Sequence, residues 1–152
     1  MNPQFWKLSQ GPDHFGHEEI LSSIEDRLVY VHRTTGPMGR SGKSQASEFM
    51  NADIGDYFYL TNGNKGIYIL GQFIGPANVF SRKEDGWLDR PFRLIRPSRS
   101  RDSYNGKKKW WTPNENSTFV PVPEDEMDLF ERQILRPYFD IRLEDFGIEK
   151  TN

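Results

Sequence analysis

The sequence predicts an α+β fold: a small, strongly curved, mostly antiparallel sheet, or pseudo-barrel, with short helices packed outside it. The strongest evidence lies at 56–75, where two apolar runs, 57–60 and 67–74, flank the turn-forming residues 62–66 and predict a β-hairpin. Gly71 falls within the second strand, which indicates a bulge or a close approach of another stretch of backbone. The remaining candidate strands do not alternate regularly with helices, and this excludes a doubly wound parallel sheet.

Before the hairpin, the sequence predicts four short elements and one loop. Aromatic and β-branched residues predict strands at 4–9 and 28–32. A helix is expected at 17–23, because apolar residues recur there at helical spacing, and one or two helical turns at 44–50. Residues 34–43 are rich in Gly, Ser and Thr, and we expect them to form a flexible loop.

After the hairpin, a strand is predicted at 92–95, a polar basic loop at 98–109 and an extended segment at 120–123. The most regular helix is expected at 124–135, because acidic residues suit its first turn and apolar residues then share one face. Pro137 is expected to end this helix.

The composition is that of one intracellular domain. A chain of 152 residues can bury a core unaided, and the 14% of aromatic residues supply large core side chains. The chain has no cysteine, and His14 and His17 alone are too few to ligate a metal, so we expect no metal and no cofactor. No apolar run approaches the roughly 20 residues of a membrane span, and we expect a cytoplasmic protein without membrane contact.

We assign the domain to 1–139 and interpret 140–152 as an acidic tail or linker.

Charge is distributed unevenly along the chain, although the net charge is only −2. Residues 82–109 hold ten Lys or Arg against four Asp or Glu, while 115–149 hold ten acidic residues against three arginines. A basic band on a nearly neutral domain indicates contact with phosphates on one side. The candidates in this band for contacts to a nucleic-acid backbone are Arg82, Arg99, Arg101, Lys107, Lys108 and Lys109.

Three tryptophans lie in polar stretches that the pattern predicts to be loops. Trp87 follows Asp-Gly, and Trp110 and Trp111 follow three lysines. A base-stacking surface combines rings and cations, because the ring contacts the base while the cation contacts the phosphate. The alternative is that a tryptophan belongs to the core, which suits Trp6 because it lies inside a predicted strand.

The segment GPMGRSGKS at 36–44 approaches a phosphate-binding loop without matching one. The motif requires glycine at the position of Pro37, and no strong helix follows. We therefore expect a basic, glycine-rich loop that lies along a nucleic-acid backbone, rather than a nucleotide site.

Four segments, in this order, resemble one family. They are the opening strand FWKLS at 5–9, the loop and short helix RSGKSQASEFM at 40–50, the strands GDYFYL and GIYILG at 55–60 and 66–71, and the closing strand FVPVP at 119–123 ahead of a helix. Over residues 4–136 the chain resembles the EVE domain of the PUA-like superfamily, which is related to YTH domains. It is most similar to the modified-base-reading N-terminal domains of McrB-type restriction systems.

The resemblance implies an EVE-type curved sheet and a non-catalytic module that flips a methylated cytosine or adenine of DNA into an aromatic cage. It implies that the residues contacting the base are Trp6, Lys7, Leu8 and Ser9, with Trp87, Trp110 or Trp111 as a wall of the cage. It implies contacts to the nucleic-acid backbone or to a base edge from Arg40, Ser41, Lys43, Ser44 and Gln45. The implied partners are nucleic acid carrying the modified base and other domains or subunits of a restriction complex.

Two other functions remain open. A small nuclease or RNA-processing enzyme of a neighbouring PUA-like branch would need a general acid or base, for which the candidates are Lys7, His14, His17 and His32. A protein-interaction domain would instead use its acidic C-terminal helix as the binding surface.

Overall fold

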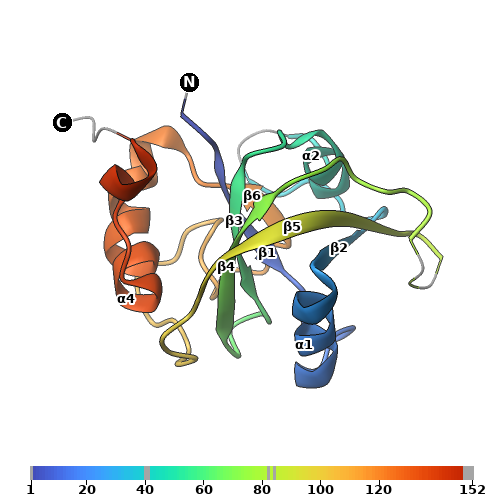
Figure 1. Ribbon diagram of the computed structural model, residues 1–152, viewed down its shortest axis with the longest axis horizontal. Helices are drawn as coiled ribbons and strands as arrows, with labels where there is room; N and C mark the ends of the chain where they lie inside the picture. The colour runs from blue at the N-terminus through green and yellow to red at the C-terminus, as the bar shows by residue number, and fades with distance from the viewer. Residues whose placement is uncertain (1, 40–41, 82, 84, 149–152) are drawn as a thin grey trace.

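The fold is built on one curled, mixed sheet of six strands in the order β2-β5-β4-β3-β1-β6. The computed structural model describes residues 2–39, 42–81, 83 and 85–148. The strands are β1 (Phe5–Ser9), β2 (Leu28–His32), β3 (Tyr57–Thr61), β4 (Ile67–Phe73), β5 (Trp87–Pro97) and β6 (Phe119–Pro121). Neighbouring strands are antiparallel except β1 and β3, which are parallel. The sheet curls into a half-barrel (Figure 1), which confirms the predicted α+β class with a curved sheet.

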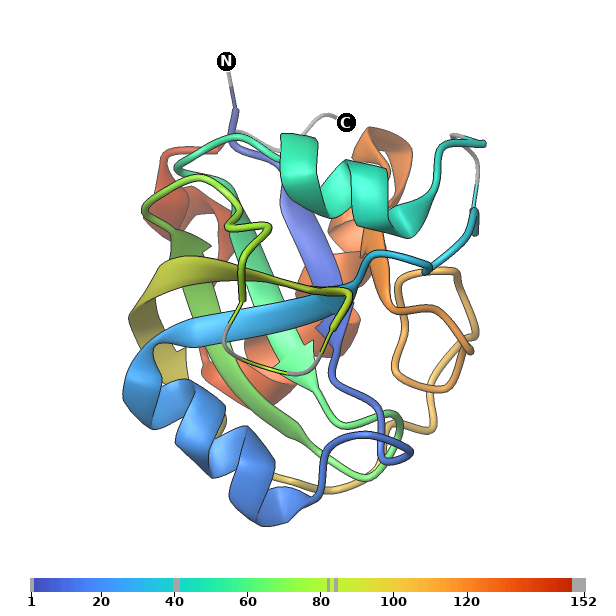
Figure 2. The ribbon, with the colours of Figure 1, turned by 90° about the vertical axis from the view of Figure 1, so that its right-hand side faces the viewer.

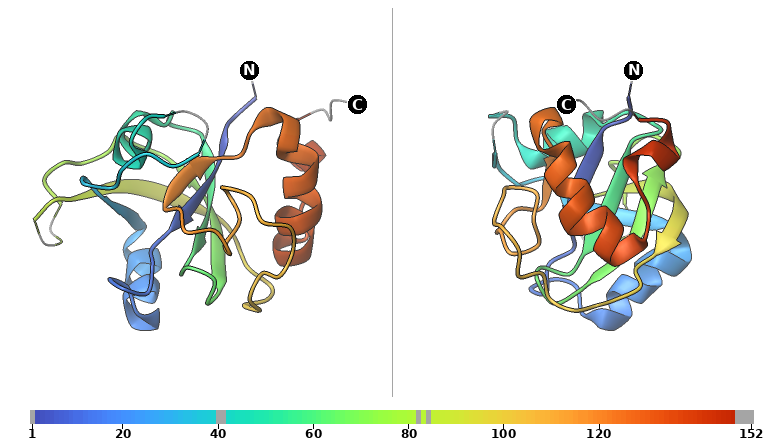
Figure 3. Two further views of the ribbon diagram at one scale, coloured as in Figure 1. Left: turned by 180° about the vertical axis from the view of Figure 1, so that it is seen from behind. Right: turned by 90° about the vertical axis from the view of Figure 1, so that its left-hand side faces the viewer.

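Helices lie on both sides of the sheet. The helices α1 (His17–Asp26) and α2 (Gln45–Asn51) lie on the side that Figure 2 turns toward the viewer. The opposite side is covered by a helical segment near the C-terminus (Figure 3). That segment comprises η1 (Glu124–Glu126), α3 (Met127–Phe130), the π-helical turn η2 (Glu131–Leu135), α4 (Arg136–Phe139) and, after a short break, η3 (Leu143–Phe146). Within the described ranges, no helix is both long enough and apolar enough to cross a membrane.

The alternation of side chains along the strands creates two hydrophobic cores. In β1, Trp6 and Leu8 belong to the core on the side of α1 and α2, whereas Phe5 belongs to the core beneath the C-terminal helices. Phe49 of α2 is fully buried in the first core, and Phe130 of α3 is fully buried in the second. Because both faces of the sheet are covered, all five residues of β1 are buried.

Gly71 combines a break in strand pairing with a close approach of two rings. The register between β4 and β5 shifts between Leu70 and Gly71. A Cβ atom at Gly71 would lie 2.5 Å from Cζ of Phe58 and 3.1 Å from Cδ2 of Phe92, and both rings are buried. The register shift confirms the irregularity predicted from the sequence, and the close approach is made by two side-chain rings and not by a backbone segment.

The substitution Gly71→Ala is expected to lower the free energy of unfolding by about 1–3 kcal/mol, because the added methyl group displaces two packed rings. Gly36→Ala is a matched control, since a Cβ atom at Gly36 meets nothing within 4 Å. Urea denaturation followed by tryptophan fluorescence measures both variants. Equal unfolding midpoints for the two variants would contradict the packing around Gly71.

The fifth strand differs from its prediction. Instead of beginning near residue 92, β5 begins at Trp87 and pairs there with His32 of β2. The expectation that Trp87 lies in a loop is therefore wrong. Gly86, with φ of +89°, makes the turn, and the strand begins at the next residue.

The C-terminal part of the chain also differs from its prediction. The prediction that Pro137 ends the helix is wrong, because the helical segment continues to Phe139. Pro137 follows the π-helical turn, in which the N–H of Arg136 bonds to the Glu131 carbonyl and the i→i−4 pattern is already interrupted. A residue without an N–H is therefore tolerated at this position. Within 140–148, part of the expected tail, the side chains of Ile141, Leu143 and Ile148 are buried in the second core, and residues 149–152 lie outside the described residues.

Candidate functional site

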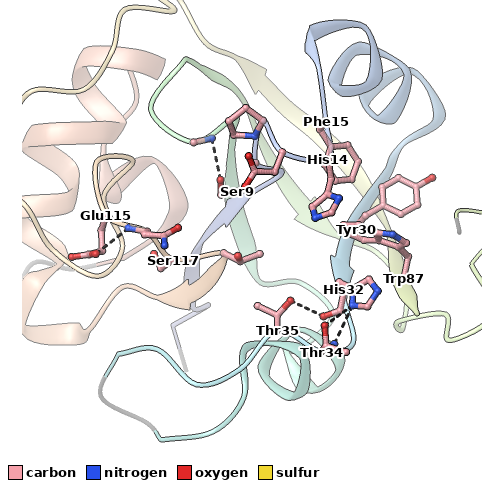
Figure 4. Close-up of a pocket in the computed structure, with 16 residues that line it drawn as sticks. Ser9, His14, Phe15, Tyr30, His32, Thr34, Thr35, Trp87, Glu115 and Ser117 are labelled. Atoms are coloured by element: carbon pink, nitrogen blue, oxygen red, sulfur yellow. Dashed lines mark hydrogen bonds between the residues drawn. The ribbon is translucent and has the colours of Figure 1, made fainter. Parts of the chain in front are cut away.

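A pocket of about 480 Å³ brings together five separate segments of the chain (Figure 4). They are the end of β1 with the loop after it, β2 with the residues after it, the β3–β4 turn, the start of β5 and the segment before β6. The lining residues are Ser9, Gly11, Pro12, Asp13, His14, Phe15, Tyr30, His32, Thr34, Thr35, Gly63, Trp87, Glu115, Asn116, Ser117 and Thr118. The volume lies within the roughly 300–1,000 Å³ of pockets that bind small molecules.

Aromatic and imidazole rings form one side of the pocket (Figure 4). The rings of Phe15, His14 and His32 meet the Trp87 ring edge-on, with centroids 5.3, 5.5 and 5.0 Å away. The ring of Tyr30 lies 6.1 Å from that of Phe15. Phe15 and Trp87 belong to the first core and are only 3% and 8% exposed, so this side of the pocket presents a small part of a packed ring cluster.

Polar groups form the opposite side, where Glu115 and Ser117 lie across the pocket from the rings (Figure 4). Main-chain hydrogen bonds fix this segment, since the N–H of Ser9 donates to the Thr118 carbonyl at 2.7 Å. The buried side chain of Gln45 adds to this, because its Oε1 accepts from the N–H of Thr118 at 2.6 Å. The polar side of the pocket is thus a preformed wall.

Lys7 supports the polar wall from within the protein. Its side chain is fully buried, and its Nζ donates to the carbonyl of Glu115 and to Oγ of Ser117, each at 2.8 Å. Burial lowers the pKa of Lys7 from 10.5 to about 7, although the Glu115 carboxylate acts in the opposite direction. Lys7 lies behind the wall and does not line the pocket.

The lowered pKa of Lys7 predicts how stability depends on pH. Between pH 7 and pH 10.5 the unfolded chain binds the Lys7 proton more strongly than the native protein does, so stability rises with pH across this window. Relative to a Lys7→Met variant, the free energy of unfolding of the wild-type protein should rise by about 1 kcal/mol per pH unit between pH 7.5 and pH 9.5. Chemical denaturation at three pH values measures the difference. A constant difference between the two proteins would contradict the burial of an ionisable Lys7.

Of the residues predicted to contact a base, Ser9 and Trp87 line this pocket. Trp6 and Leu8 lie in the first core, where the Trp6 ring stacks on Phe119 with centroids 4.3 Å apart. Because β1 is covered on both faces, its side chains cannot form a pocket floor, and only its last residue reaches the pocket.

The other two tryptophans lie outside the pocket. Trp111 is fully buried in the second core, where its Nε1 donates to Glu126 at 2.8 Å and its ring packs edge-on against Phe130. Trp110 is 43% exposed and lies against Gly39, where an added Cβ atom would be 3.7 Å from the ring. Trp110 is therefore the only one of the four tryptophans that offers a large exposed ring.

Two of the residues predicted to contact a nucleic-acid backbone have structural roles. Ser44 caps α2, because its Oγ accepts from the N–H of Ser47 at 3.0 Å. Gln45 is buried, and both ends of its side-chain amide bond to the main chain. Its Nε2 donates to the Gly36 carbonyl at 2.9 Å, and its Oε1 accepts from the N–H of Thr118. By contrast, Lys43 is exposed at the surface, immediately before this capping residue.

The basic side chains of 99–109 are spread over several surroundings. Arg99 pairs with Asp140 at 3.5 Å, Arg101 lies 4.7 Å over the Tyr68 ring, and Lys109 pairs with Glu126 at 2.8 Å. Lys107 and Lys108 are exposed, and Lys108 lies 3.9 Å from Glu115 on the polar wall. The predicted contacts Arg40, Ser41 and Arg82 lie outside the described residues.

Several pocket residues carry no signal that the sequence alone would single out. Phe15 sits in a polar loop between two glycines, which is the one local hint, whereas Tyr30 looks like an ordinary strand residue. The sequence alone gives His14 and His32 as candidates for proton transfer, and His14 with His17 as a weak candidate pair for a metal. No group of three or more metal-ligating side chains is found within the described part of the chain.

Comparisons with known proteins show the fold and not a family. No protein-family model matches the sequence, and no curated protein matches it significantly. The crystal structure of protein Atu2648 from Agrobacterium tumefaciens, a structural genomics target, is similar with a TM-score of 0.52 and 15% sequence identity. The match covers 85% of this chain and 91% of that one. At this identity the likeness establishes a shared α+β architecture alone.

Proposed function

We propose that the protein is a non-catalytic module that binds DNA and recognises a methylated cytosine or adenine by accepting the flipped base into this pocket. The observation that carries the proposal is the facing arrangement of a ring cluster around Trp87 and a fixed polar wall at Glu115–Ser117. A flipped base needs both, because its faces stack on rings while its edge makes hydrogen bonds.

The chemistry of each side suits one part of a methylated base. Phe15, Tyr30 and Trp87 supply apolar ring surface, on which both a base and its methyl group lose contact with water. Across from the rings, the Glu115 carboxylate and the side chains of Asn116 and Thr118 supply acceptors and donors, because the main-chain N–H groups of 115–118 already donate within the protein. Lys7 and Gln45 hold this edge-binding segment in place, so that binding does not require it to become ordered.

Exposed cations beside the pocket would contact the phosphates. Lys108 is tied to Glu115 of the polar wall, which places the lysines at 107–108 next to the pocket. Lys43 and the exposed ring of Trp110 extend this surface, since Trp110 packs against Gly39 of the glycine-rich loop. Arg99 pairs with Asp140 and Arg101 lies over the Tyr68 ring; we assign the backbone contacts to Lys107 and Lys108 because they lie beside the polar wall.

The finer assignment is a PUA-like, EVE-type module that acts in the cytoplasm as the targeting domain of a modification-dependent restriction system. Its support is the order of the four segments at 5–9, 40–50, 55–71 and 119–123, the curled half-barrel sheet, and the place of Ser9, at the end of the opening strand, on the pocket wall.

Binding to matched duplexes tests the proposal. Fluorescence anisotropy would compare labelled duplexes that differ in a single methyl group on cytosine or adenine. Burial of one methyl group predicts at least about fourfold tighter binding of one methylated duplex. Affinity for all duplexes should fall with increasing salt, since lysine–phosphate contacts release counterions. Equal affinities at every salt concentration, or no binding at low salt, would overturn the proposal.

The presence of His14 and His32 on the pocket wall favours a nuclease as the second candidate. Lys7 and His17 do not support it, because Lys7 is buried behind the wall and His17 lies outside the pocket, with its Nδ1 2.8 Å from the hydroxyl of Tyr68. Incubation with labelled DNA and RNA distinguishes the candidates. We expect no cleavage; cleavage that is lost in both His14→Ala and His32→Ala would establish the enzyme instead.

A further inference from the structure

The residues that line the pocket include two carboxylates, those of Asp13 and Glu115, and among the described lining residues there is no lysine or arginine. His32 adds no positive charge. Its Nδ1 accepts the main-chain N–H of Thr34 at 3.2 Å and the Thr34 hydroxyl at 2.8 Å, so this nitrogen carries no proton. At about pH 7.5, where an ordinary imidazole is mostly neutral, the formal charges that a ligand meets on the lining are therefore carboxylates.

Most hydrogen-bond donors around the pocket are already used within the protein. The four main-chain N–H groups of 115–118 donate to oxygen atoms of the chain itself. The hydroxyl of Thr35 donates to the His32 carbonyl at 2.7 Å, and the hydroxyl of Ser117 donates to the Trp110 carbonyl. The pocket therefore offers a ligand more acceptors than donors.

The Glu115 carboxylate can accept further hydrogen bonds. Its Oε1 accepts the N–H of Asn116 at 2.9 Å and its Oε2 lies 3.9 Å from Nζ of Lys108, whereas a carboxylate has about four acceptor positions. Apolar rings lie on the other side of the pocket (Figure 4), and they keep water from part of the space. Attraction between opposite charges is stronger where water is excluded.

The neighbouring ammonium groups lie outside the pocket lining. Lys7 lies behind the polar wall, and burial lowers its pKa to about 7, so that it is partly neutral near that pH. Lys108 has a side chain that is 61% exposed, and the Nζ of Lys83 lies 4.4 Å from the ring centroid of Phe15. A ligand inside the pocket contacts the carboxylates and not these lysines.

We propose that the pocket selects a positively charged base, namely a cytosine or adenine whose methyl group sits on a ring nitrogen of the pairing edge, such as 3-methylcytosine. This inference rests on the proposed function, since it names the ligand of the same pocket. Methylation of N3 gives cytosine a positive charge, blocks a ring acceptor and leaves the exocyclic amine as a donor. Asp13 and Glu115 complement all three changes, because carboxylates accept hydrogen bonds and attract a cation.

The test compares 3-methylcytosine with 5-methylcytosine, which carry the same methyl group at different ring positions and of which only the first is cationic near neutral pH. Each is placed in a labelled DNA duplex opposite an abasic site, so that neither base has a pairing partner to leave. Fluorescence anisotropy measures both affinities. The wild-type protein should bind the 3-methylcytosine duplex about tenfold more tightly, because charge-assisted hydrogen bonds are roughly twice as strong as neutral ones.

Two isosteric variants show whether the carboxylates cause this preference. Glu115→Gln and Asp13→Asn keep the shape of the side chain and remove its charge, and each should reduce the preference. In the double variant the two affinities should agree within about twofold. Glu144→Gln is the control, because Glu144 also pairs with a basic side chain, Arg142 at 3.5 Å, but lies outside the pocket. It should keep the full preference.

The outcomes separate this inference from the proposed function. Equal affinity of the wild-type protein for the two duplexes, or tighter binding of 5-methylcytosine, would overturn the selection of a cation while the proposed function stands. A preference for 3-methylcytosine that survives in the double variant would also overturn it, since the carboxylates would not be its source. If neither duplex binds at low salt, the proposed function fails and this inference fails with it.

Discussion

Replacing Arg90 with methionine is expected to lower the free energy of unfolding by at least about 3 kcal/mol. Arg90 is 1% exposed, and its guanidinium group donates to three main-chain carbonyls, those of Gly75 at 3.0 Å, Phe49 at 3.0 Å and Ala52 at 2.6 Å. It also lies 4.4 Å over the ring of Phe73. Methionine fills part of the space but leaves all three buried carbonyls without a donor, and each such loss is costly.

The charge of Arg90 survives burial because its surroundings compensate it. Burial lowers the pKa of Arg90, and the nearby carboxylates of Asp56 and Asp53 act in the opposite direction. The three carbonyls belong to α2, to the residue after it and to the chain just after β4, so Arg90 on β5 links the helix to the sheet. Arg93→Met is the matched control, because Arg93 lies on the same strand with an exposed side chain.

Urea denaturation of the two variants measures the difference. Arg93→Met should remain within about 0.5 kcal/mol of the wild-type protein, as exposed substitutions usually do. A loss below 1 kcal/mol for Arg90→Met would show that the buried hydrogen-bond network around Arg90 does not hold α2 to the sheet.

Replacing Trp87 with leucine is expected to weaken binding to the preferred methylated duplex by about tenfold or more. Trp87 is the ring that Phe15, His14 and His32 surround, and loss of base–aromatic stacking costs about 1–3 kcal/mol per base. Leucine keeps an apolar side chain at a buried position, so that the fold is better preserved than with alanine. Binding to the unmethylated duplex should change less, because the base of that duplex makes less use of the pocket.

Trp110→Ala is the control for Trp87→Leu. Trp110 is exposed outside the pocket, so its loss should lower the affinity for methylated and unmethylated duplexes by the same factor. Thermal unfolding of both variants would confirm that each is folded at the temperature of the binding measurement. If Trp87→Leu kept the full preference for the methylated duplex, the ring cluster could not be the site of base recognition.

The sheet could be predicted where local signals were strong. Leu28–His32 has the predicted bounds because its β-branched content is continuous, and the hairpin follows from its two apolar runs and its Asn and Gly residues. The first half of β5 was missed because Trp87–Pro97 contains Asp89, Arg90 and Pro91, which read as a polar break. Burial of these polar groups depends on partners from α2 and from the chain after β4, and no local pattern reveals such partners.

The candidate site could be predicted only in part for a related reason. Ser9 and Trp87 carry local signals, a strand end and a tryptophan in polar surroundings. Trp111 carries the same signal and is also buried, but it packs against Phe130 of α3 and not at the pocket, and only tertiary packing decides between these two places. Phe15 and Tyr30 join the pocket through the curl of the sheet, which brings β2 and the loop after β1 together.

The central claim is that a methylated base enters the ring cluster of Phe15, Tyr30 and Trp87, and NMR of isotope-labelled DNA tests it most directly. Duplexes would carry a ¹³C-labelled methyl group on cytosine C5 or on adenine N6. When the protein saturates the preferred duplex, the methyl resonance should shift upfield through the ring currents of the cluster and show nuclear Overhauser contacts to these rings. If the methyl resonances of both bound duplexes keep the positions that they have in free DNA, the base does not enter this pocket and the claim is wrong.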